Sequence, residues 1–207
     1  MARRAPDALK EVIRDFRRDQ IIETSRQLFG SRGTTEVSMD DIASASGVAR
    51  STVYVYFANR DELLQACVQS MYDQMQSAIV PIFEDNAPPI ERLRAVLFGV
   101  LERIDESPAF FRLAMATQST AGASGSAAVG GTLMLIGLDM IRLLEDVVSS
   151  GVASGDFRSD VDQDRAVVLI GQQMYGALSI RAGEPEPIPV GQAADEICAF
   201  LLRGLGG

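Results

Sequence analysis

Residues 38–64 read Ser-Met-Asp-Asp-Ile-Ala-Ser-Ala-Ser-Gly-Val-Ala-Arg-Ser-Thr-Val-Tyr-Val-Tyr-Phe-Ala-Asn-Arg-Asp-Glu-Leu-Leu, and the fold of the chain is decided in this stretch. Ser38 is predicted to cap a helix that begins at Met39, because Asp41 can return a hydrogen bond to the Ser38 N–H. Gly47 is the residue type that a left-handed turn favours, so the helix is expected to end just before it. A second short helix follows the turn. The pattern therefore predicts a helix-turn-helix.

The second helix is expected at about residues 50–57 and has two unlike faces. Val53 and Phe57 lie about one turn apart and are predicted to be buried against the first helix. The opposite face carries a cation, hydroxyls, aromatic rings and methyl groups, from Arg50, Ser51, Tyr54 and Val55, with Thr52 and Tyr56 at its edges. Such groups meet phosphates, base edges and thymine methyls in a DNA major groove. The same two-helix pattern also occurs in proteins that bind no DNA, so the pattern alone leaves both interpretations open.

A wider set of residues resembles the N-terminal signature of the tetracycline-repressor family of bacterial transcription regulators. The matching residues are Leu28-Phe29, Gly33, Thr34-Thr35, 37–43, Gly47-Val48, 52–57 and 59–64. The resemblance is close over about residues 19–66 and beyond them extends only to the order of the helices. It implies an all-α fold of about nine helices, with an N-terminal three-helix helix-turn-helix DNA-binding domain and a C-terminal helical domain for ligand binding and dimerisation.

The resemblance also implies domain boundaries and DNA contacts. The expected domains are an N-terminal arm at residues 1–16, the DNA-binding domain at residues 17–63, and the effector-binding and dimerisation domain at residues 64–207. The residues expected to contact DNA are Ser38, Arg50, Ser51, Thr52, Tyr54, Tyr56 and Arg60. Ala49 departs from the family pattern, in which a Ser often caps the recognition helix. Arg60 stands where Lys is frequent and keeps the positive charge.

The regions on both sides of the helix-turn-helix are predicted to be helical. A helix at residues 19–31 is expected to end at Gly33. The basic segment before this helix is either a mobile arm or an N-terminal extension of the helix, and the sequence leaves both open. A long helix is expected to start after Asn59 and to run to about Val80, where Pro81 ends or kinks it.

Further helices are predicted along the rest of the chain. They are expected from Pro89 to about Ile104, from Pro108 through Met115, from about Thr132 to Ser154, from Asp162 to about Arg181, and from Gln192 to Leu205. Residues 119–131 are almost wholly Ser, Gly, Ala and Thr, a composition typical of a flexible connection. In the family, the last two long helices form a four-helix bundle with a second subunit, so the resemblance implies a homodimer that reads a palindromic operator in double-stranded DNA.

The resemblance also implies a small, apolar or amphipathic effector bound in the C-terminal domain. The residues offered for this site, because they lie on the helices that enclose the family's cavity, are Phe110, Phe111, Met115, Met134 and Tyr175. Met and Phe at helical spacing more often form plain core. A protein of the same fold that acts as an activator, or as an architectural or partner-controlled protein without a ligand, therefore remains an alternative.

The composition argues against several other classes of protein. The chain has no histidine, which removes Ser-His and Cys-His nucleophile pairs and the usual zinc ligands. We expect no catalytic residue, no metal and no cofactor. Residues 1–60 carry a charge of +2 (ten Lys or Arg against eight Asp or Glu), and the remainder carries −11 (nine against twenty), so the acid lies outside the DNA-binding region.

The sequence also predicts the cellular location of the protein and the state of its two cysteines. No apolar run is long enough to span a bilayer, and no secretory signal is recognised, so we expect a cytoplasmic protein without membrane contact. Cys67 and Cys198 are far apart in the sequence and form no CxxC pair. We therefore expect two buried, free thiols rather than a disulfide or a metal site.

Overall fold

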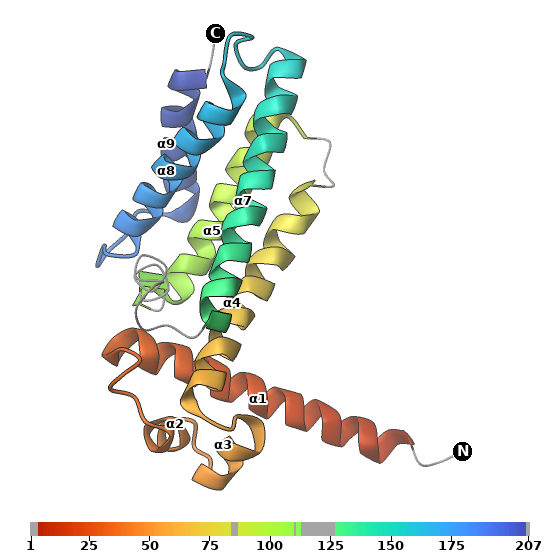
Figure 1. Ribbon diagram of the computed structural model, residues 1–207, viewed down its shortest axis with the longest axis vertical. Coiled ribbons are helices and arrows are strands. Elements are labelled where there is room, and N and C mark those ends of the chain that lie inside the picture. The colour runs from red at the N-terminus through yellow and green to blue at the C-terminus, as the bar shows by residue number, and fades with distance from the viewer. Residues whose placement is uncertain (1–3, 84–86, 110, 113–126, 206–207) are drawn as a thin grey trace.

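The computed structural model describes residues 4–83, 87–109, 111–112 and 127–205 (Figure 1). Its helices are α1 (Arg4–Arg32), α2 (Met39–Ala45), α3 (Arg50–Tyr56), α4 (Arg60–Phe83), α5 (Pro89–Glu106), α7 (Ala127–Ser154), α8 (Gln163–Arg181) and α9 (Val190–Leu205). Pro108, Ala109, Phe111 and Arg112 also have a helical backbone, where a short helix was predicted. No strand occurs in these ranges, and the predicted all-α fold is confirmed.

The helices form a small head at one end of a long bundle (Figure 1). Helices α1, α2 and α3 make the head, and the N-terminal half of α1 projects away from the rest of the molecule. In the body, α4, α5 and α7 pack against one another, while α8 packs on α7 and α9 packs on α5. Helices α8 and α9 therefore lie side by side on one flank of the body.

Helix α4 belongs to both parts of the molecule. Its first half, through Cys67 and Met71, packs in the head core with residues of α1, α2 and α3. Its second half, from Met75 to Ile79, packs in the body core against α5 and α7. A rotation of α4 would therefore move the head relative to the body.

The turn and cap residues predicted from the sequence have the expected geometry. The Ser38 hydroxyl accepts a hydrogen bond from the Asp41 N–H, and the Asp41 carboxylate accepts one from the Ser38 N–H at 2.9 Å, which completes the capping box of α2. The Ser38 hydroxyl also donates a hydrogen bond to the Asp41 carboxylate, and this bond, together with the one from the Ser38 N–H, lowers the pKa of Asp41. Gly33, Gly47 and Gly155 have φ values of 85°, 67° and 83°, the left-handed conformation that glycine adopts without strain.

Two helix boundaries in the first half of the chain differ from the sequence prediction. Helix α1 starts at Arg4, so residues 4–16 continue this helix, which is the second of the two alternatives that the sequence left open. Pro6 is compatible with a helix here because it lies in the first turn of α1. Glu11 lies three residues before Arg14, a spacing at which opposite charges stabilise a helix. Helix α4 passes Pro81 and ends at Phe83, because a proline so close to the last turn removes only one hydrogen bond.

Two boundaries in the second half also differ. Helix α7 begins at Ala127 rather than Thr132, because the alanines before the Gly130-Gly131 pair favour helix. Residues 127–131 of the predicted flexible connection are therefore helical, and residues 119–126 lie outside the described ranges. Helix α9 begins at Val190 and not at Gln192, a shift within the usual uncertainty of helix ends.

Both cysteines are buried and free, as predicted. Burial raises the pKa of the Cys67 thiol to about 12 and that of Cys198 to about 11. A thiolate is the reactive form of cysteine, so both side chains are expected to be inert at neutral pH.

The connection between α7 and α8 offers a test of the packing. A Cβ added at Gly151 would lie 2.2 Å from the ring of Phe157, which is only 2% exposed. We expect Gly151→Ala to lower the free energy of unfolding by about 1–3 kcal/mol, because the ring must leave its site. In Gly137→Ala, on the same helix, the new Cβ meets nothing within 4 Å, and we expect no loss of stability. The measurement is urea unfolding of the two variants. If both unfolded at the same urea concentration, the close packing of Phe157 on Gly151 would be contradicted.

Candidate DNA interface and effector cavity

The recognition helix α3 is buried on one side and open on the other. Val53 is fully buried, and Phe57 directly after the helix is 2% exposed, as predicted. On the opposite side Tyr54 is 42% and Val55 is 77% exposed. Arg50 and Ser51 are exposed as well, while Thr52 and Tyr56 are half-buried at the edges. The structure thus brings these side chains to one face, and their DNA contacts remain a prediction.

Arg50 is held in place by neighbours on two helices. Its guanidinium forms an ion pair with Asp40 of α2 at 2.8 Å and lies 5.5 Å from the centre of the Tyr54 ring. The hydrogen bond with Tyr54, together with the charge of Asp40, raises the pKa of Arg50. Both partners are exposed, so DNA can replace these contacts at little cost.

Two hollows lie in the surface of the head. One, of about 370 Å³, is lined by Ser38 and Arg60 together with Val37, Met39, Asn59 and Asp61. Arg60 donates a hydrogen bond at 3.3 Å to the carbonyl of Thr35, which places its charge at this rim. The Ser38 hydroxyl is engaged in the cap of α2.

The other hollow, of about 350 Å³, lies at the start of α3 and was not anticipated from the sequence. Arg17 and Gln20 of α1 line it with Thr52 and the turn residues Ser46 to Ala49. Ala49 provides no side-chain cap for α3, as its residue type predicted. Arg17 is exposed and was missed as a binding residue, because only the folded chain brings α1 beside the recognition helix.

An apolar cavity of about 320 Å³ lies in the body between α4, α5, α7 and α8. Phe111 and Tyr175 line it, as the sequence analysis proposed for an effector site. Phe110 and Met115 lie outside the described ranges, and so does the side chain of Met134. The other lining residues are Met75, Val100, Gly137, Met140, Ile141, Leu144, Val167, Val168, Gly171, Gln172, Met174 and Leu178.

These additional residues were missed for a simple reason. In the sequence they have the same apolar pattern as the neighbouring core residues. Only the packing of the four helices shows which apolar side chains line the cavity and which are buried in the core. Gln172 of α8 is the only polar residue among these additional lining residues.

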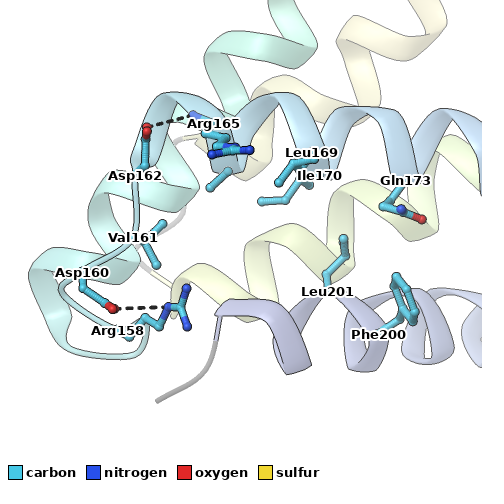
Figure 2. Close-up of a pocket in the computed structure, with 11 residues that line it drawn as sticks. Arg158, Asp160, Val161, Asp162, Arg165, Leu169, Ile170, Gln173, Phe200 and Leu201 are labelled. Atoms are coloured by element: carbon cyan, nitrogen blue, oxygen red, sulfur yellow. Dashed lines mark hydrogen bonds and ion pairs between the residues drawn. The ribbon is translucent and has the colours of Figure 1, made fainter.

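The flank formed by α8 and α9 exposes large apolar side chains. They are Val168 (62% exposed), Leu169 (57%), Ile180 (66%) and Phe200 (60%). Between these helices lies a hollow of about 440 Å³, and Figure 2 shows Leu169 of α8 and Phe200 of α9 among the residues that line it. Gly176 on α8 has open space in place of a side chain. Such an apolar face is unusual on a protein that remains a monomer.

Asp162 and Arg158 order the loop at one end of this hollow (Figure 2). The Asp162 carboxylate accepts a hydrogen bond at 3.1 Å from the Arg165 N–H and so caps α8, as predicted. Arg158 pairs with Asp160 at 3.2 Å. Among the described residues, no cluster of carboxylates and thiols could hold a metal ion, and no described helix is long and apolar enough to cross a membrane.

Comparison with known proteins places these features in a family. Residues 21–67 match the model of the bacterial regulatory proteins of the tetR family. The HTH-type transcriptional repressor KstR2 of Mycobacterium tuberculosis is 24% identical over 190 residues, which are 91% of this chain and 92% of the relative. The HTH-type transcriptional regulator TtgR of Pseudomonas putida is 31% identical over 105 residues, 50% of this chain and 48% of the relative.

Solved structures show the same fold. The ketosteroid transcriptional regulator KstR2 of Mycobacterium tuberculosis aligns with a TM-score of 0.74 and 21% identity, over 92% of this chain and 95% of the other. AibR in complex with isovaleryl coenzyme A and operator DNA aligns with a TM-score of 0.69 and 20% identity, over 89% and 97%. The chain described here belongs to the tetR family of bacterial regulatory proteins. It is a DNA-binding regulator of transcription.

Proposed function

We propose that the protein is a homodimeric repressor that binds a palindromic operator through α3 and is released from it by a small apolar or amphipathic effector. The observation that carries this proposal is the combination of an open, polar recognition helix with an apolar cavity of about 320 Å³, joined by the shared helix α4. As a DNA-binding protein it would act in the cytoplasm.

The proposed DNA contacts divide into two groups. Arg50, Ser51 and Tyr54 lie on the open face of α3, and Thr52 lies at its edge. These four would meet base edges in the major groove. Tyr56 lies at the edge of this face, and Ser38 and Arg60 line the hollow between the start of α2 and the start of α4. These three would meet phosphates. We add Arg17 to the second group because it lines the hollow at the start of α3.

The phosphate contacts are tested by their salt dependence. We expect Arg60→Ala and Tyr56→Phe to weaken binding to all DNA sequences alike, and Arg60→Ala to reduce the slope of log affinity against log salt by about one, because one fewer counterion is released. The measurement is a series of anisotropy titrations at increasing salt. Arg94→Ala, which removes a 45% exposed side chain on α5, is the control. An unchanged slope in Arg60→Ala would contradict the assignment.

The proposed dimer uses the exposed apolar flank of α8 and α9. Burying Leu169, Ile180 and Phe200 against a second copy would remove large apolar areas from water. Gly176 leaves room for close approach of the facing helix. A two-fold axis through this interface would place two heads side by side, and a palindromic operator mirrors that symmetry.

The relatives support control by an effector. KstR2 is named a repressor and a ketosteroid transcriptional regulator, and AibR was solved with isovaleryl coenzyme A and operator DNA. The cavity of this chain is of ordinary size for a small ligand and is lined mainly by apolar side chains. It lies between α4, which enters the head, and α7 and α8, which do not.

The structure offers a path from the cavity to the head. On α4, Tyr72 donates a hydrogen bond at 2.8 Å to Asp139 of α7, and Gln76 donates to the same carboxylate. Met75, between them in sequence, lines the cavity. An effector that fits better when α4 is tilted would shift the population toward heads spaced wrongly for the operator.

A cavity-filling variant tests control by the effector. Gly137 lines the cavity and has open space at its Cβ position, so Gly137→Leu would place a branched side chain inside. We expect this variant to bind the operator as the wild type does and to resist release by any compound that releases the wild type. Gly99→Ala, on α5 outside the cavity wall, is the control for a helical glycine substitution. Equal release of wild type and Gly137→Leu would overturn the proposal.

A further inference from the structure

Helix α8 lies between two spaces of the body. On one side it forms a wall of the apolar cavity, to which Val168 and Gln172 belong. On the other side it borders the hollow that it shares with α9, through Leu169 and Gln173 (Figure 2). Adjacent residues can border different spaces because successive side chains of a helix point in directions about 100° apart. All four side chains are exposed, so the edge of α8 between the two spaces faces outward.

The apolar cavity is open along this outward edge. Ile141 of α7, and Val168 and Tyr175 of α8, line the cavity, yet each is at least 41% exposed. Gln172 is exposed as well, whereas Val100 of α5 on the inner wall is buried. We call the exposed part of the lining, formed by Ile141, Val168, Gln172 and Tyr175, the mouth of the cavity.

The proposed dimer interface reaches this mouth. Val168 belongs both to the mouth and to the exposed apolar flank of α8 and α9, and Leu169 of that flank is the next residue. Gly176, one turn after Gln172, has open space in place of a side chain, so a facing helix can approach closely there. A second copy that covers Leu169 and Gly176 therefore also lies beside Gln172 and over the mouth.

The surroundings of Gln172 change when the mouth is covered. In the single chain its amide is exposed, and water supplies its hydrogen bonds. Beneath a second copy the amide lies between the apolar cavity and an apolar interface, where an unmade hydrogen bond is costly. A glutamine amide has two N–H donors and one acceptor oxygen. It therefore favours a ligand that places a donor or an acceptor beside it.

The rest of the cavity lining points to an uncharged ligand. Among the described residues that line the cavity, none is charged, and only Gln172 and Tyr175 have side-chain N–H or O–H groups. A charged group buried in such a lining would have no ionic partner there, and its desolvation would oppose binding. Hydroxyl and carbonyl groups can be matched by an amide without this cost.

We propose that a second copy of the chain closes the mouth of the effector cavity, and that Gln172, buried by this closure, selects an uncharged effector with a hydroxyl or carbonyl group at the mouth. This inference rests on the proposed function, since it names the chemical class of the effector and the part of the dimer in binding it. The effector then binds the dimer more tightly than the single subunit, and by linkage it strengthens the dimer.

Two compounds of nearly equal size test the selection by Gln172. α-Naphthol and α-methylnaphthalene share their rings and differ in having a hydroxyl or a methyl group. Calorimetric titration of the full-length protein gives the ratio of their affinities. In Gln172→Met, which keeps an unbranched side chain but removes the amide, we expect this ratio to shift about tenfold toward α-methylnaphthalene.

The control for this variant lies on the same helix. Gln163 is exposed at the start of α8 and outside the lining of the cavity, so Gln163→Met is expected to keep the wild-type ratio. An unchanged ratio in Gln172→Met would overturn the proposal. Binding of neither compound to the wild-type protein would overturn it as well.

A monomeric variant tests the part of the second copy. Leu169→Glu, at a residue outside the lining of the cavity, is expected to split the dimer and to open the mouth to water. We expect its affinity for α-naphthol to fall by about tenfold or more, because the bound rings stay partly in water. The ratio of affinities is expected to shift as in Gln172→Met, since water then serves the amide. Phe200→Glu on α9 replaces this variant if it folds poorly.

The outcomes separate this inference from the proposed function. A monomeric Leu169→Glu protein with the wild-type affinity and ratio would overturn this inference alone. Selection through Gln172, without release of a labelled operator by α-naphthol, would support the inference and contradict control by the effector. A Leu169→Glu protein that remains dimeric would contradict the proposed dimer face and this inference together.

Discussion

Replacing Leu169 or Phe200 by Glu is expected to split the homodimer and to lower operator affinity by about a thousandfold. Both side chains are more than half exposed in the single chain, and both line the hollow between α8 and α9 (Figure 2). A carboxylate buried there without a partner would cost more than the interface gains from one apolar side chain. Each head would then bind alone and would lose the added contacts of the second half-site.

Sedimentation equilibrium and a titration of labelled operator would check this result. Val80→Glu is the matched control, because Val80 is also an exposed apolar residue, at 45%, but lies on α4 away from the α8 and α9 flank. The control is expected to remain dimeric and to bind as the wild type does. A dimeric Leu169→Glu protein with full affinity would show that the subunits associate elsewhere.

Arg50→Ala and Tyr54→Ala are expected to relax the preference for particular base pairs, each by about 10–100-fold at the positions they read. Arg50 is directed over the open face of α3 by Asp40 and by the Tyr54 ring, so its fork of donors is partly pre-arranged. Loss of either residue should leave binding to unrelated DNA nearly unchanged, because phosphate contacts dominate that binding.

Competition between the operator and single-base variants of it would measure this preference. Arg94→Ala, distant in sequence and partly exposed on α5, should keep the wild-type ranking of sequences. If Arg50→Ala lowered affinity for every sequence by the same factor, Arg50 would be a phosphate contact instead.

The helices of the head could be predicted closely from the sequence because their ends are determined by interactions between residues near in sequence. The capping box of Ser38 and Asp41 and the left-handed Gly47 act over only a few residues, and both appear as expected. The open and buried faces of α3 follow from the helical period alone. Arg17 could not be found in this way, since its place beside α3 depends on how α1 packs.

The helix limits that were wrong reflect competition between weak local preferences. Pro81 is a strong helix breaker in the interior, yet α4 continues to Phe83 because its apolar side is packed in the body core and the proline lies near the end. Of the two alternatives for residues 4–16, the structure has the helical extension of α1, because no further proline follows Pro6 before the helix ends at Arg32.

The effector cavity could be predicted only in outline. Phe111 and Tyr175 were identified from the order of helices, but the other walls come from helices far apart in sequence.

Selection of bound sequences from a random duplex pool, at physiological salt and with the purified protein, tests the central claim most directly. The proposed homodimer should enrich an inverted repeat whose half-sites are centred about one helical turn apart, as two symmetric recognition helices require. That repeat would also provide the operator for the release experiments. A pool that shows only salt-sensitive general binding, without enrichment, would contradict sequence-specific repression and would favour an architectural or partner-controlled role.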